Sequence, residues 1–226
     1  MQRAWRIFKR VVLWLFILQL VYIVFCKWIN PPITLTQAGS LIHGYGLKRD
    51  YVSFSEMSPN IKLAVMASED QLFPDHNGFD IKAIKKAMKY NEKHVTKLRG
   101  ASTISQQVAK NVFLWQGRSM VRKGLEVYFT FMIEKIWSKK RILEMYLNVA
   151  EMGKGVFGVQ AAAKAFFNKD AKNLTRAEAA MIAAALPNPK VYTIKPLSPY
   201  VAKRYGEIMR QMNNLEGDTD IAELIK

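Results

Sequence analysis

The chain has 226 residues, half of them hydrophobic, and a formal net charge of +16. This composition excludes an intrinsically disordered protein, and the single cysteine, Cys26, excludes an internal disulfide bond. Only five of the basic residues lie in the first 30 positions, so residues 31–226 keep an excess of 11 positive charges, which indicates a polyanionic partner such as nucleic acid, anionic lipid or a phosphorylated substrate.

The N-terminal segment is hydrophobic enough to cross a membrane. Residues 11–26, VVLWLFILQLVYIVFC, are apolar except for Gln19, and with their neighbours they reach the roughly 20 residues that a span requires. A cleaved signal peptide is the alternative, but no small-x-small cleavage pattern follows Cys26. We therefore predict a basic N-terminus over residues 1–10 and a retained transmembrane anchor over residues 11–30.

The charges on either side of this anchor predict its orientation. Four basic residues precede the hydrophobic run and one follows it closely, which places the N-terminus in the cytoplasm and the rest of the chain outside. A domain outside the cytoplasm does not meet nucleic acid. The basic excess is therefore better matched to membrane phosphates or to a lipid-linked phosphate substrate.

Residues 31–50 are expected to form a linker of extended chain or short strands. A helix is predicted to follow over residues 58–69, with Ser58 as N-cap and a proline in its first turn. Glu69 then falls at the C-terminal end of that helix. The negative pole of the helix dipole and the adjacent Asp70 should raise the pKa of Glu69 toward the range that suits a general base.

A second helix is predicted from Asp80, its cap, to Tyr90. Its apolar residues Ile81, Ile84 and Met88 are expected to pack inward, because they share one face. Four lysines form the opposite face, which is either solvated or in contact with lipid headgroups: Lys82, Lys85, Lys86 and Lys89. The polar residues 91–100 are expected to form a loop.

A third helix is predicted within residues 100–111, and its first turn exposes backbone N–H groups that can bind phosphate. Ser102 lies at this turn, either as a phosphate contact or only as an N-cap. Further along the chain, Arg118, Arg122 and Glu126 are spaced four residues apart, which places them along one helical stripe. An ordinary surface ion pair between Arg122 and Glu126 is the alternative interpretation.

Three more helices are predicted over residues 138–152, 160–167 and 175–186, the last opened by a capping box of Thr175 and Glu178. Residues 153–158 are expected to be a loop. No run of alternating residues is long enough for a substantial sheet. We therefore predict a mainly α-helical domain over residues 51–226.

Four sequence blocks carry a resemblance to a known family. The first is E-D-x-x-F-x-x-H-x-G, at Glu69, Asp70, Phe73, His76 and Gly78. The second is G-x-S-T-I-x-Q-Q-x-x-K-N, at Gly100, Ser102, Thr103, Ile104, Gln106, Gln107, Lys110 and Asn111. The third is R-K-x-x-E, at Arg122, Lys123 and Glu126. The fourth is K-x-x-I-L-E-x-Y-L-N with two spaced glycines, at Lys139, Ile142, Leu143, Glu144, Tyr146, Leu147, Asn148, Gly153 and Gly158.

In this order, the blocks resemble the peptidoglycan glycosyltransferase family, the lysozyme-like membrane enzymes that polymerise lipid II, and its short single-domain branch above all. The resemblance covers residues 50–192. One departure is the pair Phe166 and Phe167, where Tyr-Phe is common. The Ser-x-x-Lys and Lys-Thr-Gly motifs of an accompanying transpeptidase module are absent from the sequence.

The resemblance implies a lysozyme-like helical fold and an inverting transfer that forms β-1,4 links between sugars. It makes Glu69 the base that deprotonates the acceptor 4-hydroxyl, and Glu126 the second essential carboxylate. It implies a substrate and pyrophosphate site made of Ser102, Gln106, Lys110, Arg118, Arg122 and Lys123. Its supporting residues are Asp70, His76, Asn111, Glu144 and Asn148. We expect His76 to orient Glu69 or the turn rather than to bind metal.

The implied partners are lipid II, the growing lipid-linked glycan strand, the bacterial inner membrane and proteins of the division or elongation machinery, with no nucleic acid. Mg2+ or another divalent cation is a candidate cofactor, with Glu69 or Glu126 as its ligand, although no metal-ligand spacing is present. No organic cofactor is expected. Two rival functions stay open: a lytic transglycosylase or lysozyme-type hydrolase, and an inactive membrane scaffold of the cell-wall machinery.

Overall fold

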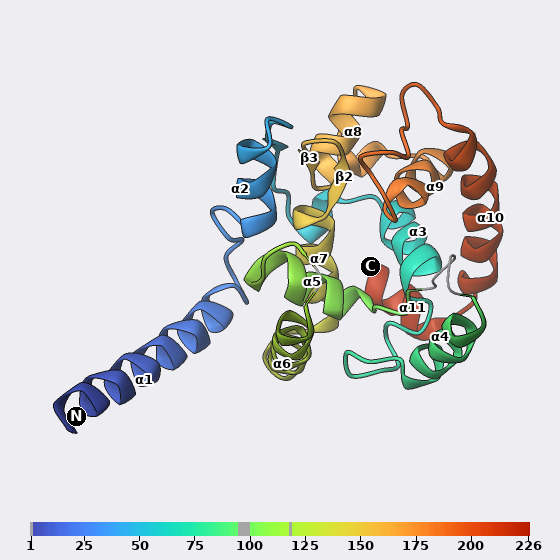
Figure 1. The fold of residues 1–226 in the computed structure, drawn as a ribbon. Helices are drawn as coiled ribbons and strands as arrows, with labels where there is room; N and C mark the ends of the chain where they lie inside the picture. Colours follow the sequence, from blue (N-terminus) through green and yellow to red (C-terminus); the bar gives the residue numbers. More distant parts are fainter. Residues whose placement is uncertain (1, 95–99, 118) are drawn as a thin grey trace.

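Figure 1 shows one long N-terminal helix, α1 (Gln2–Phe25), projecting from a cluster of shorter helices. The computed structural model describes residues 2–94, 100–117 and 119–226. Helix α1 is long and apolar enough to cross a membrane, and it fits a single-pass anchor. It begins upstream of residue 11 because the basic N-terminal residues continue the same helix.

The end of α1 is fastened to the helical domain by specific contacts. Ile23 and Cys26 are fully buried, and the indole nitrogen of Trp137 donates to the carbonyl of Ile23 at 2.9 Å. The Arg141 guanidinium donates to the carbonyl of Cys26 at 2.9 Å and to the side chain of Asn30 at 2.9 Å. The anchor is therefore packed onto the domain rather than tethered by loose chain.

Residues 31–50 differ from the expected extended linker. They contain helix α2 (Leu35–Ile42), which a reciprocal capping box of Thr34 and Gln37 begins. Two orphan N–H groups are satisfied by this box, which explains why so short a helix is stable. The prediction of extended chain was therefore wrong for this segment.

The other helices surround two buried ones at the centre, α3 (Pro59–Glu69) and α7 (Lys139–Val149). The remaining helical elements are α4 (Ile81–Lys93), α5 (Ile104–Phe113), α6 (Met120–Ile136), α8 (Val159–Phe167), α9 (Arg176–Ala185), α10 (Pro199–Leu215), α11 (Thr219–Ile225), and the 3-10 turns η1 (Phe54–Glu56) and η2 (Ala171–Asn173). Helix α3 packs against α9, α10 and α11, whereas α5 packs between α6 and α7. The prediction of a mainly helical domain is confirmed.

Several predicted helix starts are confirmed by their caps. The Ser58 side chain caps α3, with Pro59 in the first turn. The Asp80 carboxylate accepts the N–H of Ala83 at 2.8 Å at the start of α4. Thr175 and Glu178 form the predicted box at α9. These side chains act locally, so the sequence alone was enough to place them.

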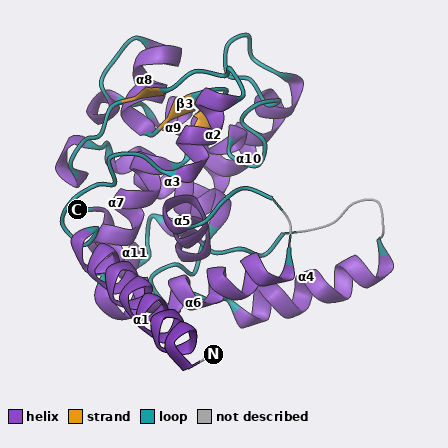
Figure 2. Ribbon diagram, turned by 60° about the vertical axis from the view of Figure 1, so that its left-hand side comes forward, coloured by secondary structure: helices purple, strands orange, loops and turns teal. Residues whose placement is uncertain are grey.

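Helix α4 departs from the expected packing. Ile81 and Met88 are 55% and 60% exposed, and no residue of α4 is buried. Figure 2 shows α4 extending away from the body of the domain. The inward packing predicted for this face was therefore wrong for Ile81 and Met88, which lie largely in solvent, whereas Ile84 is partly buried.

The predicted helix over residues 138–152 ends earlier, at Val149, and residues 151–157 form part of a small sheet where the end of that helix and a loop were expected. Strands β1 (Lys48–Arg49), β2 (Glu151–Gly153) and β3 (Val156–Phe157) have the order β1-β3-β2, parallel between β1 and β3 and antiparallel between β3 and β2. Gly158 follows β3 with a φ of +82°, and a Cβ there would lie 2.5 Å from the carbonyl oxygen of Asn148. Only glycine fits this position.

We expect Gly158→Ala to lower the free energy of unfolding by about 2 to 3 kcal/mol, because it adds both a strained φ and a clash with backbone. The matched control is Gly206→Ala in α10, where nothing lies within 4 Å of the added carbon. That change should stabilise the helix by up to about 1 kcal/mol. Denaturant unfolding of the full chain in detergent measures both. Equal effects of the two substitutions would contradict the steric account of Gly158.

Candidate active site

Glu69 lies at the C-terminal end of α3, where the sequence predicted it. Its carboxylate accepts a hydrogen bond of 2.7 Å from the Gln107 amide and one of 3.3 Å from the Ser68 hydroxyl. Burial raises the pKa of Glu69, the two hydrogen bonds oppose this, and the charge of Asp70 adds a smaller upward effect. The predicted direction was correct, but desolvation is the main cause.

Asp70 and His76 form hydrogen bonds that fix the turn following Glu69. The Asp70 carboxylate accepts the backbone N–H of Ile104 at 3.0 Å, which ties this turn to the start of α5. Its other oxygen contacts Nε2 of His76 at 2.9 Å, and Nδ1 of that ring accepts the N–H of Gly78 at 3.2 Å. Since Nδ1 accepts, Nε2 carries the proton and donates to Asp70. His76 thus orients Asp70 and the turn.

The start of α5 is capped by Thr103, not by Ser102. Thr103 and Gln106 form a reciprocal capping box, and the Thr103 hydroxyl also donates to the carbonyl of Gly78 at 2.7 Å. Gln106 is only 3% exposed and its amide oxygen serves this cap, and the residue is not among the described residues that line the two cavities below. Ser102 precedes the helix and lines a cavity together with Glu69.

Glu126 lies on α6 among basic residues, as predicted. Its carboxylate is paired with the Arg122 guanidinium at 3.0 Å and with the Lys123 ammonium at 2.5 Å, and the residue is only 3% exposed. The buried Nε of Arg122 has no hydrogen-bond partner in the described part of the chain. Arg118, predicted to extend this cluster, lies outside the described residues.

Lys110, on α5, interacts electrostatically with both Glu69 and Glu126. Burial lowers its pKa, Glu126 and Glu69 both raise it, and the neighbouring cations Arg122 and Lys123 lower it. Its ammonium makes no hydrogen bond or ion pair with any residue that the structure describes. A partly desolvated cation without a partner can bind an anionic group of a ligand.

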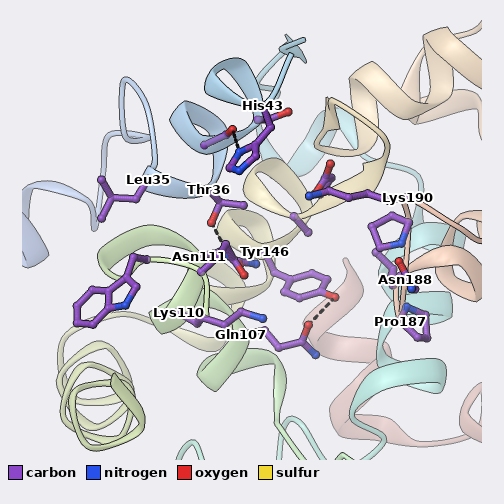
Figure 3. A pocket seen from close by; sticks show the side chains of 18 residues that line it. Leu35, Thr36, His43, Gln107, Lys110, Asn111, Tyr146, Pro187, Asn188 and Lys190 are labelled. Atoms are coloured by element: carbon purple, nitrogen blue, oxygen red, sulfur yellow. Dashed lines mark hydrogen bonds and ion pairs between the residues drawn. The ribbon is translucent and has the colours of Figure 1, made fainter. Parts of the chain in front are cut away.

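Figure 3 shows a cavity into which Lys110 and Gln107 reach from α5 beside Tyr146 of α7. Its volume is about 540 Å³. The Tyr146 hydroxyl donates to the Gln107 amide oxygen at 3.4 Å, so these residues form a chain from Tyr146 through Gln107 to Glu69. We call this space the Lys110 cavity. Its other walls, which sequence reasoning missed, come from α2 and from residues 186–190.

A second cavity of about 340 Å³ is lined by Glu69 itself. Gly100, Ala101 and Ser102 form one wall, and Gln211 of α10 forms another. We call it the Glu69 cavity. Glu69 therefore lines one cavity while its hydrogen-bond partner lines the next.

The other predicted site residues divide into two groups. Asn111 lines the Lys110 cavity. Glu144 accepts the N–H of Phe54 at 3.0 Å. Both amide atoms of Asn148 pair with the backbone of Val52, at 3.0 and 2.9 Å. Glu144 and Asn148 thus hold the chain that leads into α3.

No metal-binding group of three or more His, Cys, Asp or Glu side chains occurs among residues 2–94, 100–117 and 119–226. Both oxygens of Glu126 are already paired with cations, and Glu69 accepts from Gln107 and Ser68. These donors do not fit a dedicated site for Mg2+, which prefers carboxylate and water oxygens in an octahedron.

Comparison with known proteins gives one consistent result. The family model described as Transglycosylase matches residues 37–213. A protein of Mannheimia succiniciproducens named biosynthetic peptidoglycan transglycosylase is 57% identical over 76% of this chain and 70% of its own length. A protein of the same name from Escherichia coli is 54% identical over 80% of this chain and 76% of its own length. Another from Yersinia pseudotuberculosis is 47% identical over 99% of this chain and 95% of its own length.

Proposed function

The chain belongs to the Transglycosylase family and is a peptidoglycan glycosyltransferase, and we propose that it polymerises lipid II into glycan strands at the outer face of the inner membrane. The transfer inverts the anomeric carbon, forms a β-1,4 link and releases undecaprenyl pyrophosphate. The chain's own residues supply a base and a cluster of cations. The observation that carries this proposal is the unpartnered Lys110 ammonium, which the charges of both Glu69 and Glu126 influence.

The reaction balances with one base and no covalent intermediate. Glu69 accepts the proton of the acceptor sugar's 4-hydroxyl as that oxygen forms a bond to C1 of the donor sugar. The bond from C1 to the pyrophosphate oxygen breaks, and its electron pair leaves with the pyrophosphate. Gln107 holds the carboxylate in position, and the raised pKa makes Glu69 a stronger base than an ordinary glutamate.

The departing pyrophosphate needs positive charge close to its oxygens. Among the residues that the structure describes, Lys110 and the Nε of Arg122 are free to donate, because Lys123 and Nη1 of Arg122 pair with Glu126. Glu126 therefore keeps the cations in place rather than acting on the sugar. This assignment puts the donor end of the substrate in the Lys110 cavity and the acceptor sugar in the Glu69 cavity.

The anchor supports the membrane part of the proposal. Four basic residues lie in the first turns of α1, ahead of its apolar stretch, and this charge bias favours a cytoplasmic N-terminus and a periplasmic catalytic domain. Both substrates are lipid-linked, so a domain packed directly onto its anchor meets them at the bilayer surface. Proteins of the division or elongation machinery are further partners in this proposal.

Mg2+ would be held mainly by the pyrophosphate, with at most one carboxylate of this chain, because the oxygens of Glu69 and Glu126 already have partners. Bound there, it would neutralise phosphate charge. The residues of the chain perform the proton transfer and the orientation of the substrate.

The test is polymerisation of labelled lipid II by the purified full chain in detergent, with and without a chelator. We expect long glycan products, and retention of most activity in the chelator. Digestion of finished glycan without any polymer would instead establish a hydrolase, and neither activity would favour a scaffold. Complete loss of activity in the chelator, restored by added Mg2+, would overturn the secondary role given to the metal.

A further inference from the structure

Gln211 is a residue of α10 that the mechanism above does not use. Its amide oxygen is buried and has no hydrogen-bond partner in the described part of the chain. The side chain lines the Glu69 cavity, opposite the wall formed by Gly100 and Ser102. The residue that carries this unsatisfied acceptor therefore lines the same small cavity as the base.

Such an atom requires an explanation, because nearly all buried polar groups in proteins are paired. A buried acceptor without a partner destabilises the folded chain until a donor reaches it. Two neighbouring side chains donate elsewhere: the Gln71 amide donates to the carbonyl of Ala67 at 3.0 Å, and the Thr103 hydroxyl donates to that of Gly78 at 2.7 Å. A ligand that enters the cavity can supply the missing donor.

The hydrogen-bonding chemistry of this amide oxygen restricts the class of ligand that can bind. An amide oxygen accepts from an O–H or N–H and gains nothing from an ionised phosphate, which has only acceptors to offer. The cavity also holds the carboxylates of Glu69, Asp70 and Asp80, which repel anions. The site therefore suits a neutral sugar, in contrast to the Lys110 cavity.

We propose that Gln211 binds the acceptor sugar, an N-acetylhexosamine, by accepting a hydrogen bond from one of its hydroxyl or acetamido N–H groups while its 4-hydroxyl faces Glu69. Gln211 also lines an adjoining hollow of about 480 Å³ along α10. The other described residues that line it are polar: Glu207, Arg210, Asn213 and Asn214. This hollow gives the remainder of the acceptor a polar path away from Glu69.

This inference rests on the proposed function for the identity of the sugar, so the first test measures binding rather than polymerisation. The soluble disaccharide N-acetylglucosaminyl-N-acetylmuramic acid is titrated into the full chain in detergent and followed by NMR. We expect Gln211→Leu to weaken binding about 5- to 10-fold, the loss of one hydrogen bond. Gln211→Glu keeps an acceptor oxygen and should bind more tightly than the leucine variant. Lys203→Leu, an exposed change on the same helix, should bind like the wild type.

Equal affinity of the wild type and Gln211→Leu overturns the inference, whatever the polymerisation assay gives. If the leucine variant does not fold, Gln211→Asn is used instead, because its side chain is one methylene shorter and holds the amide oxygen further from the sugar. Unchanged affinity of that variant would equally overturn the inference. Weakened binding without polymer from the wild type would refute the proposed function and leave the sugar site standing. A polymerisation assay can use preformed glycan strands as the donor and vary the concentration of lipid II, the acceptor. In it we expect Gln211→Leu to raise the KM for lipid II more than it lowers kcat.

Discussion

Glu69→Gln is expected to lower the rate of lipid II polymerisation by about 10² to 10⁴-fold, the usual contribution of a positioned general base. Glutamine has the same size and can still accept the hydrogen bond from Gln107, so the end of α3 should keep its structure. What it cannot do is take a proton from the acceptor hydroxyl. The loss should therefore fall on kcat, while binding of lipid II changes little.

The matched control is Asp75→Asn, which removes an exposed carboxylate from the same turn and lines neither cavity. Circular dichroism and thermal unfolding show whether each variant is folded. Turnover by a folded Glu69→Gln variant within a few-fold of the wild type would eliminate Glu69 as the base.

The sequence was sufficient for the position of Glu69 because the signals involved are local. Ser58 and Pro59 define the start of α3, and its length carries the chain to Glu69. The start of α5 could also be predicted, because Thr103 and Gln106 have the spacing of a capping box. The adjacent Ser102, however, is an equally good cap by residue type alone. Local rules thus locate a helix end to within one residue.

Contacts between distant elements were not predictable in the same way. The pairing of Gln107 with Glu69 depends on how α5 crosses α3, and nothing in either helix states that angle. The apolar face of α4 looked like a core face because periodicity shows that a face exists, not that a partner covers it. Gln211 lies in no motif, and only the tertiary arrangement brings α10 to the cavity of Glu69.

Lys110→Met is the second change for which we expect a large effect, a fall in kcat of about 10² to 10³-fold, as for removal of one donor that stabilises transition-state charge. Methionine keeps much of the length and packing of the lysine side chain, and no hydrogen bond within the described chain is lost. The ammonium should matter most as the pyrophosphate leaves, because its charge grows in that step.

The pH profile tests the two residues together. Burial raises the pKa of Glu69, so activity should fall as the pH drops through a value above the ordinary glutamate range, where the base becomes protonated. Burial lowers the pKa of Lys110, so activity should also fall as the pH rises through a value below the ordinary lysine range, where the cation is lost. Lys110→Met should remove the alkaline limb and keep the acidic one.

The control for charge is Lys93→Met at the exposed end of α4, which changes the net charge equally but lies in neither cavity. Lys110→Arg should recover part of the rate, since it restores the cation with a different shape. A defect of Lys110→Met confined to KM would mean that the ammonium holds the pyrophosphate equally before and during departure. The leaving-group role would then have to move to Arg122, whose buried Nε has no hydrogen-bond partner among the described residues.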